Sequence, residues 1–395
     1  MEEANVGMQL GPYLLRRRLC TGGMASVWTA TDSDGRTLVV KRILPSLAAD
    51  AEFVAMFDRE AALSARLSHP NIVRVLDHGD YEGERYLAME HLHGRDLSTV
   101  MCELVKRGTP APGLGAFVGL QAARALAYVH AVTGDDGAPL HLVHRDISLS
   151  NVMLGFDGGV KLLDFGVAKA LAVELTQRTQ AGVLKGKWAY LAPEQLDGDN
   201  VDQRADLFAL GIVLWEMLTG RRLFKGATGL QTLDKVRAAR VLPPSTINPA
   251  VPPALDAIVL KALAKAPCDR FASAAKMADA LERVVAALRY EAPALASQMA
   301  SLFADESETV PTPHIALEPT APDDLAIDTV DEAPWMPGEM LSPHGATLAS
   351  LRRRSSFARG LRSRAWRMLI AAALAALLGG YTGWQISLLH AARLP

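Results

Sequence analysis

Short apolar segments separated by turn residues fill the first ninety residues of the chain. Their β-branched and aliphatic side chains, bounded by turns such as Asp32–Gly35, are typical of strands. Residues 52–67 have helical periodicity instead, and His69–Pro70–Asn71 ends it. The region predicts a small β-rich lobe with one helix. Its predicted strands are 14–19, 26–30, 37–41, 73–76 and 85–89.

After Asp96 the spacing of apolar residues becomes mainly helical and stays so to about Leu288. A β-rich lobe followed by a larger helical lobe predicts a two-lobed α+β domain with a cleft between the lobes. We expect this domain over residues 13–288, with the first lobe at about 13–90 and the second at about 94–288.

The last hundred residues have a different composition. Residues 291–345 carry eight prolines, eleven acidic residues and no Lys or Arg. Such a composition predicts a solvated, disordered linker, which we place at 291–350. Residues 352–367 then contain seven arginines and no acidic residue, and residues 368–389 carry no charge. The uncharged stretch is long enough to cross a bilayer as a helix.

Charge and cysteine content narrow the functional class. A formal net charge of −2 at pH 7 argues against a general nucleic-acid binder. The three cysteines lie far apart and show no metal-ligand spacing, so they are interpreted as reduced thiols in a cytosolic domain. The polar residues after Met1 do not resemble a secretory signal peptide.

A turn of small residues follows the first predicted strand. Gly22 and Gly23 lie within it, where small residues allow backbone N–H groups to approach phosphates closely. Lys41 comes nineteen residues after Gly22, and Glu60 comes nineteen residues after Lys41, inside the predicted helix. A lysine held over a phosphate needs a counter-ion, which Glu60 could supply. Each feature alone also fits a hairpin turn or a solvated charge.

Three ordered motifs decide the interpretation. His144–Arg145–Asp146 is followed by Asn151, five residues after the aspartate, and then by Asp164–Phe165–Gly166 and Ala192–Pro193–Glu194. With these motifs the chain resembles the protein kinase family over about residues 13–288. The resemblance is to bacterial, eukaryotic-like (Hanks-type) serine/threonine kinases. It implies a bilobal kinase fold, with a β-rich N-lobe and a helical C-lobe.

The resemblance also implies the chemistry. Phosphoryl transfer needs charge neutralisation and alignment more than covalent work. Asp146 would orient the substrate hydroxyl and accept its proton. Asn151 and Asp164 would offer hard oxygen ligands to Mg²⁺, which bridges the phosphates of ATP. Lys41 would hold the α- and β-phosphates, and Glu60 would orient Lys41.

The adenine site is implied by the end of the last N-lobe strand. Met89 resembles the gatekeeper residue, and the backbones of Glu90 and Leu92 would bind the base. The full set of nucleotide-binding residues implied by the resemblance is Leu19, Gly22, Gly23, Val27, Lys41, Met89, Glu90 and Leu92.

Three further positions resemble residues that fix the architecture of a kinase. Asp206 resembles the buried aspartate that braces the catalytic loop. Glu194 and Arg270 resemble the ion pair at the end of the activation segment. Arg145 directly precedes Asp146, and kinases with an arginine before the catalytic aspartate are commonly switched on by phosphate in the activation segment. We therefore predict autophosphorylation at the two threonines of the segment, Thr176 and Thr179, with Thr179 preferred.

The chain departs from the family pattern at several positions. The first and third glycines of the Gly-rich loop are replaced by Cys20 and Ala25. Ser148 replaces a lysine two residues after the catalytic aspartate, and Lys187 replaces a threonine. Lys187 could supply the missing cation as a fourth catalytic residue, or it could be a solvated charge at a site of lower activity. Both interpretations stay open at this point. The longer stretch around Thr133–Gly137 predicts a surface loop.

The uncharged segment 368–389 is expected to be a single transmembrane helix in the cytoplasmic (inner) membrane. The arginines before it should face the cytoplasm, which leaves the kinase domain on that side with ATP. Small residues recur along it every four positions, a spacing that favours close helix pairing and predicts a homodimer. These residues are Ala371, Ala375, Gly379, Gly383 and Ser387.

The sequence thus predicts a membrane-anchored kinase that transfers the γ-phosphate of ATP to serine or threonine hydroxyls of proteins in signalling. The partners it predicts are ATP, Mg²⁺, protein substrates and the membrane, without nucleic acid. One alternative is a pseudokinase scaffold that binds ATP and partners with little catalysis, favoured by Cys20 and Ser148. A small-molecule kinase is a second alternative, but such relatives generally lack the Ala192–Pro193–Glu194 segment.

Overall fold

The computed structural model describes residues 7–108, 111–164, 188–198 and 201–304. The chain divides into two compact units, 1–332 and 333–395, and all of the described residues belong to the first. The predicted basic segment, the transmembrane helix and the linker from residue 305 onward lie outside the described residues. Within the described residues, no helix is long and apolar enough to span a bilayer.

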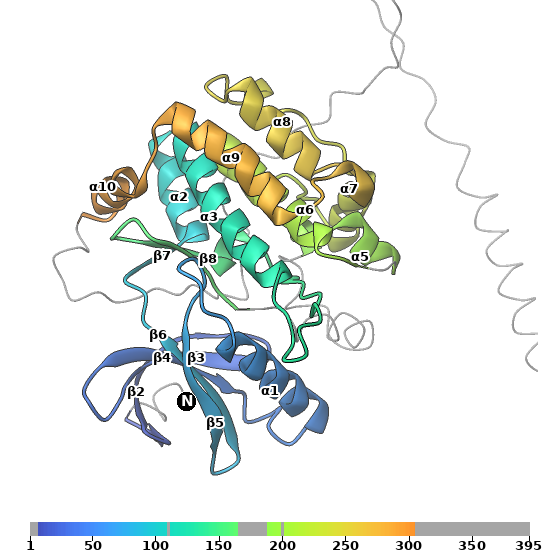
Figure 1. Ribbon diagram of the computed structural model, residues 1–395. Helices are drawn as coiled ribbons and strands as arrows, with labels where there is room; N and C mark the ends of the chain where they lie inside the picture. Colours follow the sequence, from blue (N-terminus) through green and yellow to red (C-terminus); the bar gives the residue numbers. More distant parts are fainter. Residues whose placement is uncertain (1–6, 109–110, 165–187, 199–200, 305–395) are drawn as a thin grey trace, which may run out of the picture. The chain divides into compact units, whose positions relative to one another are not determined.

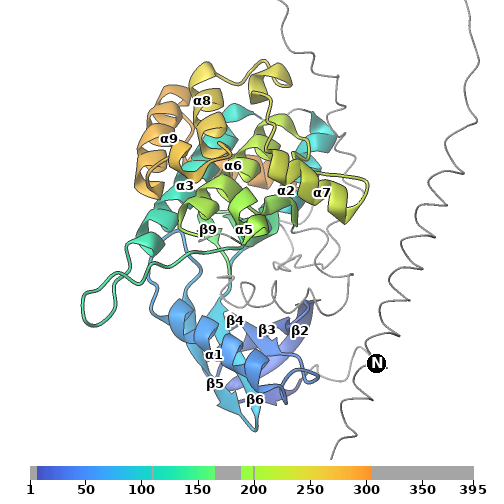
Figure 2. The same cartoon turned by 90° about the vertical axis from the view of Figure 1, so that its right-hand side faces the viewer.

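The N-lobe is built on an antiparallel sheet in the order β1-β2-β3-β4-β6-β5 (Figures 1 and 2). Helix α1, Ala51–Ala65, begins at Asp50, whose side chain accepts the backbone N–H groups of Glu52 and Phe53. The strands are β1 Gln9–Leu10, β2 Tyr13–Thr21, β3 Ala25–Thr31, β4 Thr37–Ile43, β5 Val75–Tyr81 and β6 Glu84–Glu90.

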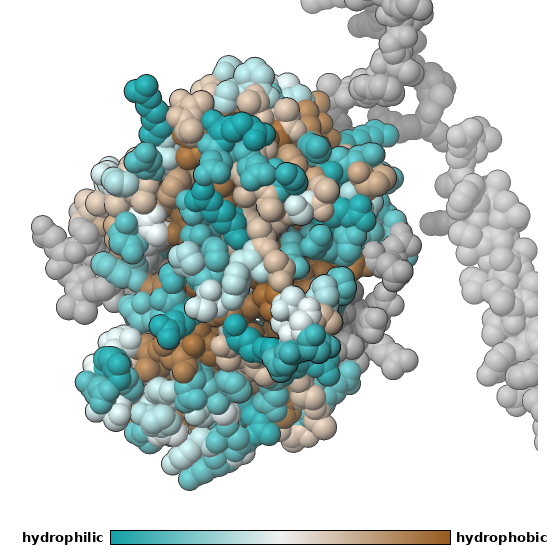
Figure 3. All heavy atoms as spheres, in the orientation of Figure 1, coloured by the Kyte–Doolittle hydropathy of each residue, from teal (hydrophilic) through white to brown (hydrophobic). Residues whose placement is uncertain are grey.

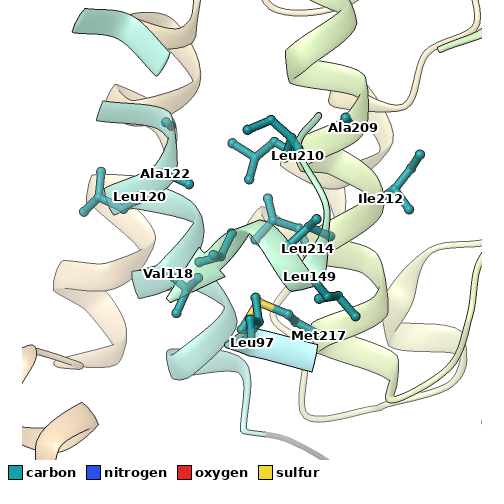
Figure 4. Packing of buried hydrophobic residues seen from close by; sticks show 14 of the residues in the cluster. Leu97, Val118, Leu120, Ala122, Leu149, Ala209, Leu210, Ile212, Leu214 and Met217 are labelled. Atoms are coloured by element: carbon teal, nitrogen blue, oxygen red, sulfur yellow. The ribbon is translucent and has the colours of Figure 1, made fainter. Parts of the chain in front are cut away.

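The C-lobe is mainly helical and is centred on α6, a helix whose fully buried side chains pack against α3 (Figure 4). The same core receives Leu97 from α2 and Leu149 from the 3-10 turn Leu149–Asn151. The helices are α2 Leu97–Arg107, α3 Pro112–His130, α5 Pro193–Asp197, α6 Arg204–Thr219, α7 Gly229–Ala238, α8 Pro253–Ala262, α9 Ala274–Leu288 and α10 Ala292–Leu302.

A second small sheet, β7-β8-β9, lies at the start of the C-lobe. Its strands are β7 Gly94–Asp96, β8 Val152–Gly155 and β9 Val160–Leu162, and all of its pairings are antiparallel. It joins the N-lobe through backbone contacts, in which Val73 N donates to the Leu162 carbonyl over 2.9 Å and Leu162 N donates to the Asn71 carbonyl over 2.9 Å. Asn151 directly precedes β8, and Asp164 comes two residues after β9.

The predicted two-lobed α+β fold is confirmed, and so are the turn at Asp32–Gly35 and the exposed loop around Thr133–Gly137. The strand predicted at 73–76 is shifted, because β5 starts at Val75 and runs to Tyr81. The β7-β8-β9 sheet was not predicted, since its strands are only three or four residues long and β7 pairs with residues more than fifty positions away.

The prediction of a disordered linker from residue 291 is wrong for its first part, because residues 292–302 form α10. Its buried residues Leu295, Met299 and Leu302 recur at helical spacing. The acidic residues that suggested a linker are absent between Ala292 and Ala304 and begin at Asp305. Averaging the composition over 291–345 concealed this helix.

Candidate active site

An apolar pocket opens between the N-lobe sheet and the β9 end. Its walls come from β3, β4, β6 and the residues around them, and Figure 3 shows hydrophobic side chains gathered where the two lobes meet. Asp164 is one of the residues that line it. A flat apolar base would fit the walls, and a charged group attached to it would extend toward Asp164. The lining residues are Val27, Val39, Val73, Met89, Glu90, Leu92, Leu163 and Asp164.

Lys41 forms a cluster of ionic hydrogen bonds beside this pocket. Its Nζ donates to Glu60 Oε1 over 2.7 Å and to Asp164 Oδ2 over 3.0 Å. The three side chains are 10–19% exposed. Burial alone would lower the pKa of Lys41, but the carboxylates of Asp164 and Glu60 outweigh it and raise the pKa above its ordinary value. Lys41 is therefore held as a cation that can bind a phosphate.

The loop that carries Asp146 is fixed by Asp206 at the start of α6. Asp206 Oδ2 accepts the backbone N–H of His144 and Oδ1 accepts that of Arg145, both over 2.8 Å. Oδ2 also accepts a hydrogen bond from His130 Nε2 over 2.8 Å. Arg145 has a φ of 63°, which is costly for a residue with a Cβ, and these bonds stabilise that conformation.

His144 is buried and links this loop to the strand before Asp164. Asp146 N donates to His144 Nδ1 over 3.3 Å, so the ring proton lies on Nε2, which donates to the Leu163 carbonyl over 3.1 Å. Burial lowers the pKa of His144, and the charges of Asp206 and Asp146 only partly oppose this. The ring is therefore neutral and structural.

Asn151 and Asp164 lie at the same end of the β8–β9 hairpin, because Leu163 N donates to the Asn151 carbonyl over 2.9 Å. The Asn151 amide nitrogen donates to both the carbonyl and the side chain of Asp146. Its Oδ1 is buried and has no hydrogen-bond partner among the described residues. An unpaired buried oxygen beside a carboxylate suits a hard cation such as Mg²⁺, so this pair fits the predicted metal.

A buried ion pair links two segments of the C-lobe. Arg270 Nη1 and Nη2 donate to the two oxygens of Glu194 over 2.6 and 2.8 Å. Arg270 is 3% exposed and donates its remaining protons to backbone carbonyls, including those of Arg204 and Lys265. This bidentate pair ties the start of α5 to the loop before α9.

Residues 13–283 match the family described as "Protein kinase domain". The chain belongs to the protein kinase family. Tyrosine-protein kinase MasK of Myxococcus xanthus is 45% identical over 278 residues, which cover 69% of this chain and 43% of MasK. Serine/threonine-protein kinase PknH of Mycobacterium tuberculosis is 35% identical over 278 residues, which cover 70% of this chain and 42% of PknH. The match thus spans less than half the length of either relative.

Solved structures of the family give the same result. The crystal structure of the Mycobacterium tuberculosis PknI kinase domain is 29% identical, covers 72% of this chain and 99% of the PknI chain, and superposes with a TM-score of 0.52. The likeness covers nearly all of that kinase domain.

The kinase domain brings together Lys41, Glu60, Asp146, Asn151 and Asp164 as the sequence predicts. The pairs at Asp206 and at Glu194–Arg270 are present as well. Of the predicted nucleotide residues, Val27, Met89, Glu90 and Leu92 line the pocket. Leu19 packs beside them, while Gly22 and Gly23 form the turn between β2 and β3, where Gly22 N donates to the Ala25 carbonyl over 2.8 Å.

The structure says little about the other site residues predicted for the kinase domain. Lys187, Thr176 and Thr179 lie outside the described residues. Ser148 is buried and its Oγ is 3.1 Å from Ser150 Oγ.

Sequence reasoning missed three pocket residues, Val39, Val73 and Leu163. Val39 could have been found, because it is two residues before Lys41 on the same face of β4. Leu163 immediately precedes Asp164. Val73 lies beside the end of β9, where its N–H donates to the Leu162 carbonyl.

Proposed function

We propose that this chain is an ATP-dependent protein kinase that phosphorylates serine or threonine hydroxyls of proteins. The observation that carries the proposal is that both groups adjoin one pocket. The Lys41–Glu60 pair is bonded to Asp164, which lines it, and the loop of Asp146 and Asn151 is hydrogen-bonded to Leu163, which also lines it. A phosphate clamp, a proton acceptor and an oxygen pair for a metal are all present. A scaffold without catalysis would not need the buried, unpaired Asn151 oxygen on a side chain that is bonded to Asp146.

Each residue has a distinct role in this proposal. The walls at Met89 and Leu92 bind adenine, and Lys41 binds the α- and β-phosphates. Asp146 accepts the proton of the substrate hydroxyl as its oxygen attacks. Mg²⁺ bound by Asn151 and Asp164 would neutralise phosphate charge during transfer.

The acceptor class is the part of the proposal with a competing candidate. The serine/threonine class is supported by relatives such as PknH, while the name of MasK, at 45% identity, supports tyrosine. Phosphoamino-acid analysis of protein labelled by the purified chain with γ-labelled ATP separates the two. Phosphoserine or phosphothreonine is expected; phosphotyrosine alone would replace the acceptor assignment without removing the kinase assignment.

Activation by autophosphorylation is part of the same proposal. The Arg145 side chain is exposed beside Asp146, so its guanidinium can receive a phosphate, which carries roughly −1.5 to −2 charge. Mass spectrometry of active protein should find phosphate on Thr179 or Thr176. Active protein with neither threonine modified would refute this step.

We also propose that Lys187 supplies the cation that Ser148 does not. Ser148 is buried and uncharged, so the position two residues after Asp146 supplies no cation itself. Lys187→Ala should reduce turnover at least about tenfold, and Ser148→Lys should restore part of the loss in the same chain. Effects of the two substitutions that simply multiply would make Lys187 a solvated charge.

The membrane anchor and the homodimer rest on residues 352–389 alone. The whole chain should sediment with membranes and resist salt extraction, whereas a chain ending at Gly345 should stay in the supernatant. In a membrane dimerisation reporter, Gly379→Leu with Gly383→Leu should weaken the signal. A salt-extractable chain would end the single-pass, cytoplasm-facing proposal.

A further inference from the structure

The last described segment, Tyr290–Ala304, lies beyond the 13–283 match to the kinase family. Its helix α10 packs against α2 and β8 (Figure 1). Leu295 and Met299 are 1% and 0% exposed, and Phe303, directly after the helix, is 7% exposed. A helix with such a buried stripe belongs to the folded domain.

Both ends of α10 are anchored by side chains of the kinase domain. The ring of Tyr290 before the helix packs on Phe117 of α3, with 5.8 Å between ring centroids. Arg107, at the end of α2, donates to the carbonyls of Ser301 and Leu302 over 3.0 and 2.8 Å. These are last-turn carbonyls, which have no partner within a helix, so Arg107 caps α10.

Two glycines give a second sign of close fit. Gly158 has a φ of 84°, and a Cβ there would lie 2.1 Å from the Ala292 carbonyl oxygen. A Cβ at Gly113 would lie 2.7 Å from the Tyr290 ring. The β8–β9 turn and the start of α3 therefore lack side chains where the segment approaches them.

The end of α10 reaches a buried arginine in β7. Arg95 is 3% exposed, and its guanidinium carbon lies 5.6 Å from the ring centroid of Phe303 and 5.9 Å from that of Phe156. The two rings meet edge to face at 6.2 Å. A desolvated guanidinium beside two aromatic rings is held by cation–π attraction.

From Arg95 the contacts continue to the pocket wall. Phe156 packs on the His93 ring at 4.7 Å, and Phe156 N donates to the His93 carbonyl over 3.0 Å. His93 directly follows Leu92, which lines the pocket. Phe303 thus contacts Arg95 and Phe156, whose neighbours along the chain and in space lead to the proposed adenine side of the pocket.

We propose that Phe303 is a positioning residue for the nucleotide pocket, acting through Arg95 and the backbone from Glu90 to Asp96. The proposal rests on the proposed function in one respect, namely that the pocket binds ATP.

The test compares Phe303→Leu with Phe303→Tyr in the 395-residue chain. Leucine keeps apolar burial and loses the ring, whereas tyrosine keeps a ring that can face Arg95. The leucine variant should show faster hydrogen exchange at residues 90–96 and roughly three- to tenfold weaker Mg-ATP binding, with kcat within about twofold. The tyrosine variant should match the parent in both measurements. Gln298→Ala, which removes the bond from Tyr290 Oη, is the control within α10 and should leave residues 90–96 unchanged.

Equal exchange at residues 90–96 in the leucine and tyrosine variants would overturn the positioning role. Hydrogen exchange and ATP binding are read without phosphotransfer, so the two proposals fail separately. A chain that shows the exchange difference but transfers no phosphate would count against the kinase activity alone.

Discussion

The two lobes hold the proposed catalytic residues in different ways. On the C-lobe side, Asp146 stands on a loop whose backbone is bonded to Asp206, a carboxylate that is 1% exposed. On the N-lobe side, Lys41 is held by two side-chain ion pairs, to Glu60 and Asp164, which come from different elements. The catalytic loop is set by the fold, whereas the lysine clamp depends in part on Glu60, a contact that a movement of α1 would break.

Lys41→Met removes the clamp and should have the largest effect. Loss of one donor at a charged transition state costs on the order of 10²–10³ in kcat, and Glu60 and Asp164 would also lose their counter-ion. Steady-state kinetics at saturating ATP measure this. Lys106→Met is the matched control, because Lys106 is exposed and pairs with Glu103 three residues earlier on the same helix. A Lys41 variant within tenfold of the parent would contradict the clamp.

Asp206→Asn tests whether the fold sets the loop. The amide has one acceptor where the carboxylate serves three donors, so the free energy of unfolding should fall by about 1–3 kcal/mol. Turnover should fall with it, by roughly tenfold, because Arg145 and Asp146 lose their fixed backbone. Chemical denaturation and kinetics of the same preparation check both. The exposed neighbour Asp202→Asn is the control, and an unfolding free energy equal in the two variants would refute the brace.

Glu60→Gln should separate the two sides. It removes the charge of one partner of Lys41, so turnover should fall by about three- to tenfold. The unfolding free energy should change by less than about 1 kcal/mol, because Asp164 still neutralises Lys41 and the glutamine oxygen can still accept from Nζ. The same denaturation and kinetic measurements apply. A loss of stability as large as that of Asp206→Asn would mean that the N-lobe clamp is also part of the fold.

The smallest effect concerns pH. The pKa of His144 lies below its ordinary value of 6.5 in the folded chain, so the unfolded chain takes up this proton first. The contribution of His144 to stability is therefore constant above pH 6.5 and is lost as the pH falls below it, by at most about 1.4 kcal/mol per pH unit. His144→Gln, which offers an acceptor and a donor without titrating, should show a shallower decline in denaturation experiments between pH 6.5 and 5. Identical slopes would contradict a neutral, buried His144.

The sequence was sufficient for those parts of the site that local motifs encode. Asp146, Asn151 and Asp164 lie in loops whose residue types are dictated by the chemistry, and their meeting follows from one hairpin. The pocket wall was only partly predictable, since Val73 and Leu163 come together through the pairing of residues 72–73 with Leu162 at the end of β9. A contact of that kind has no local pattern.

The C-terminal helix was missed for a different reason. Leu295, Met299 and Phe303 have the spacing of a buried face, but an acidic, proline-rich stretch follows directly and dominated the composition. What makes α10 part of the domain is its fit to Arg107 and Arg95, residues about two hundred positions earlier. Only the folded chain shows that fit.

The most direct test of the central claim is transfer of γ-labelled phosphate from ATP to protein by the purified 395-residue chain, run beside Asp146→Ala. The parent chain should label protein. The variant should do so at a rate lower by roughly 10²–10⁴-fold, with ATP affinity within about twofold, because Asp146 accepts a proton and does not hold the nucleotide. A parent chain that binds ATP without labelling protein, or a variant that labels protein as fast as the parent, would contradict the claim.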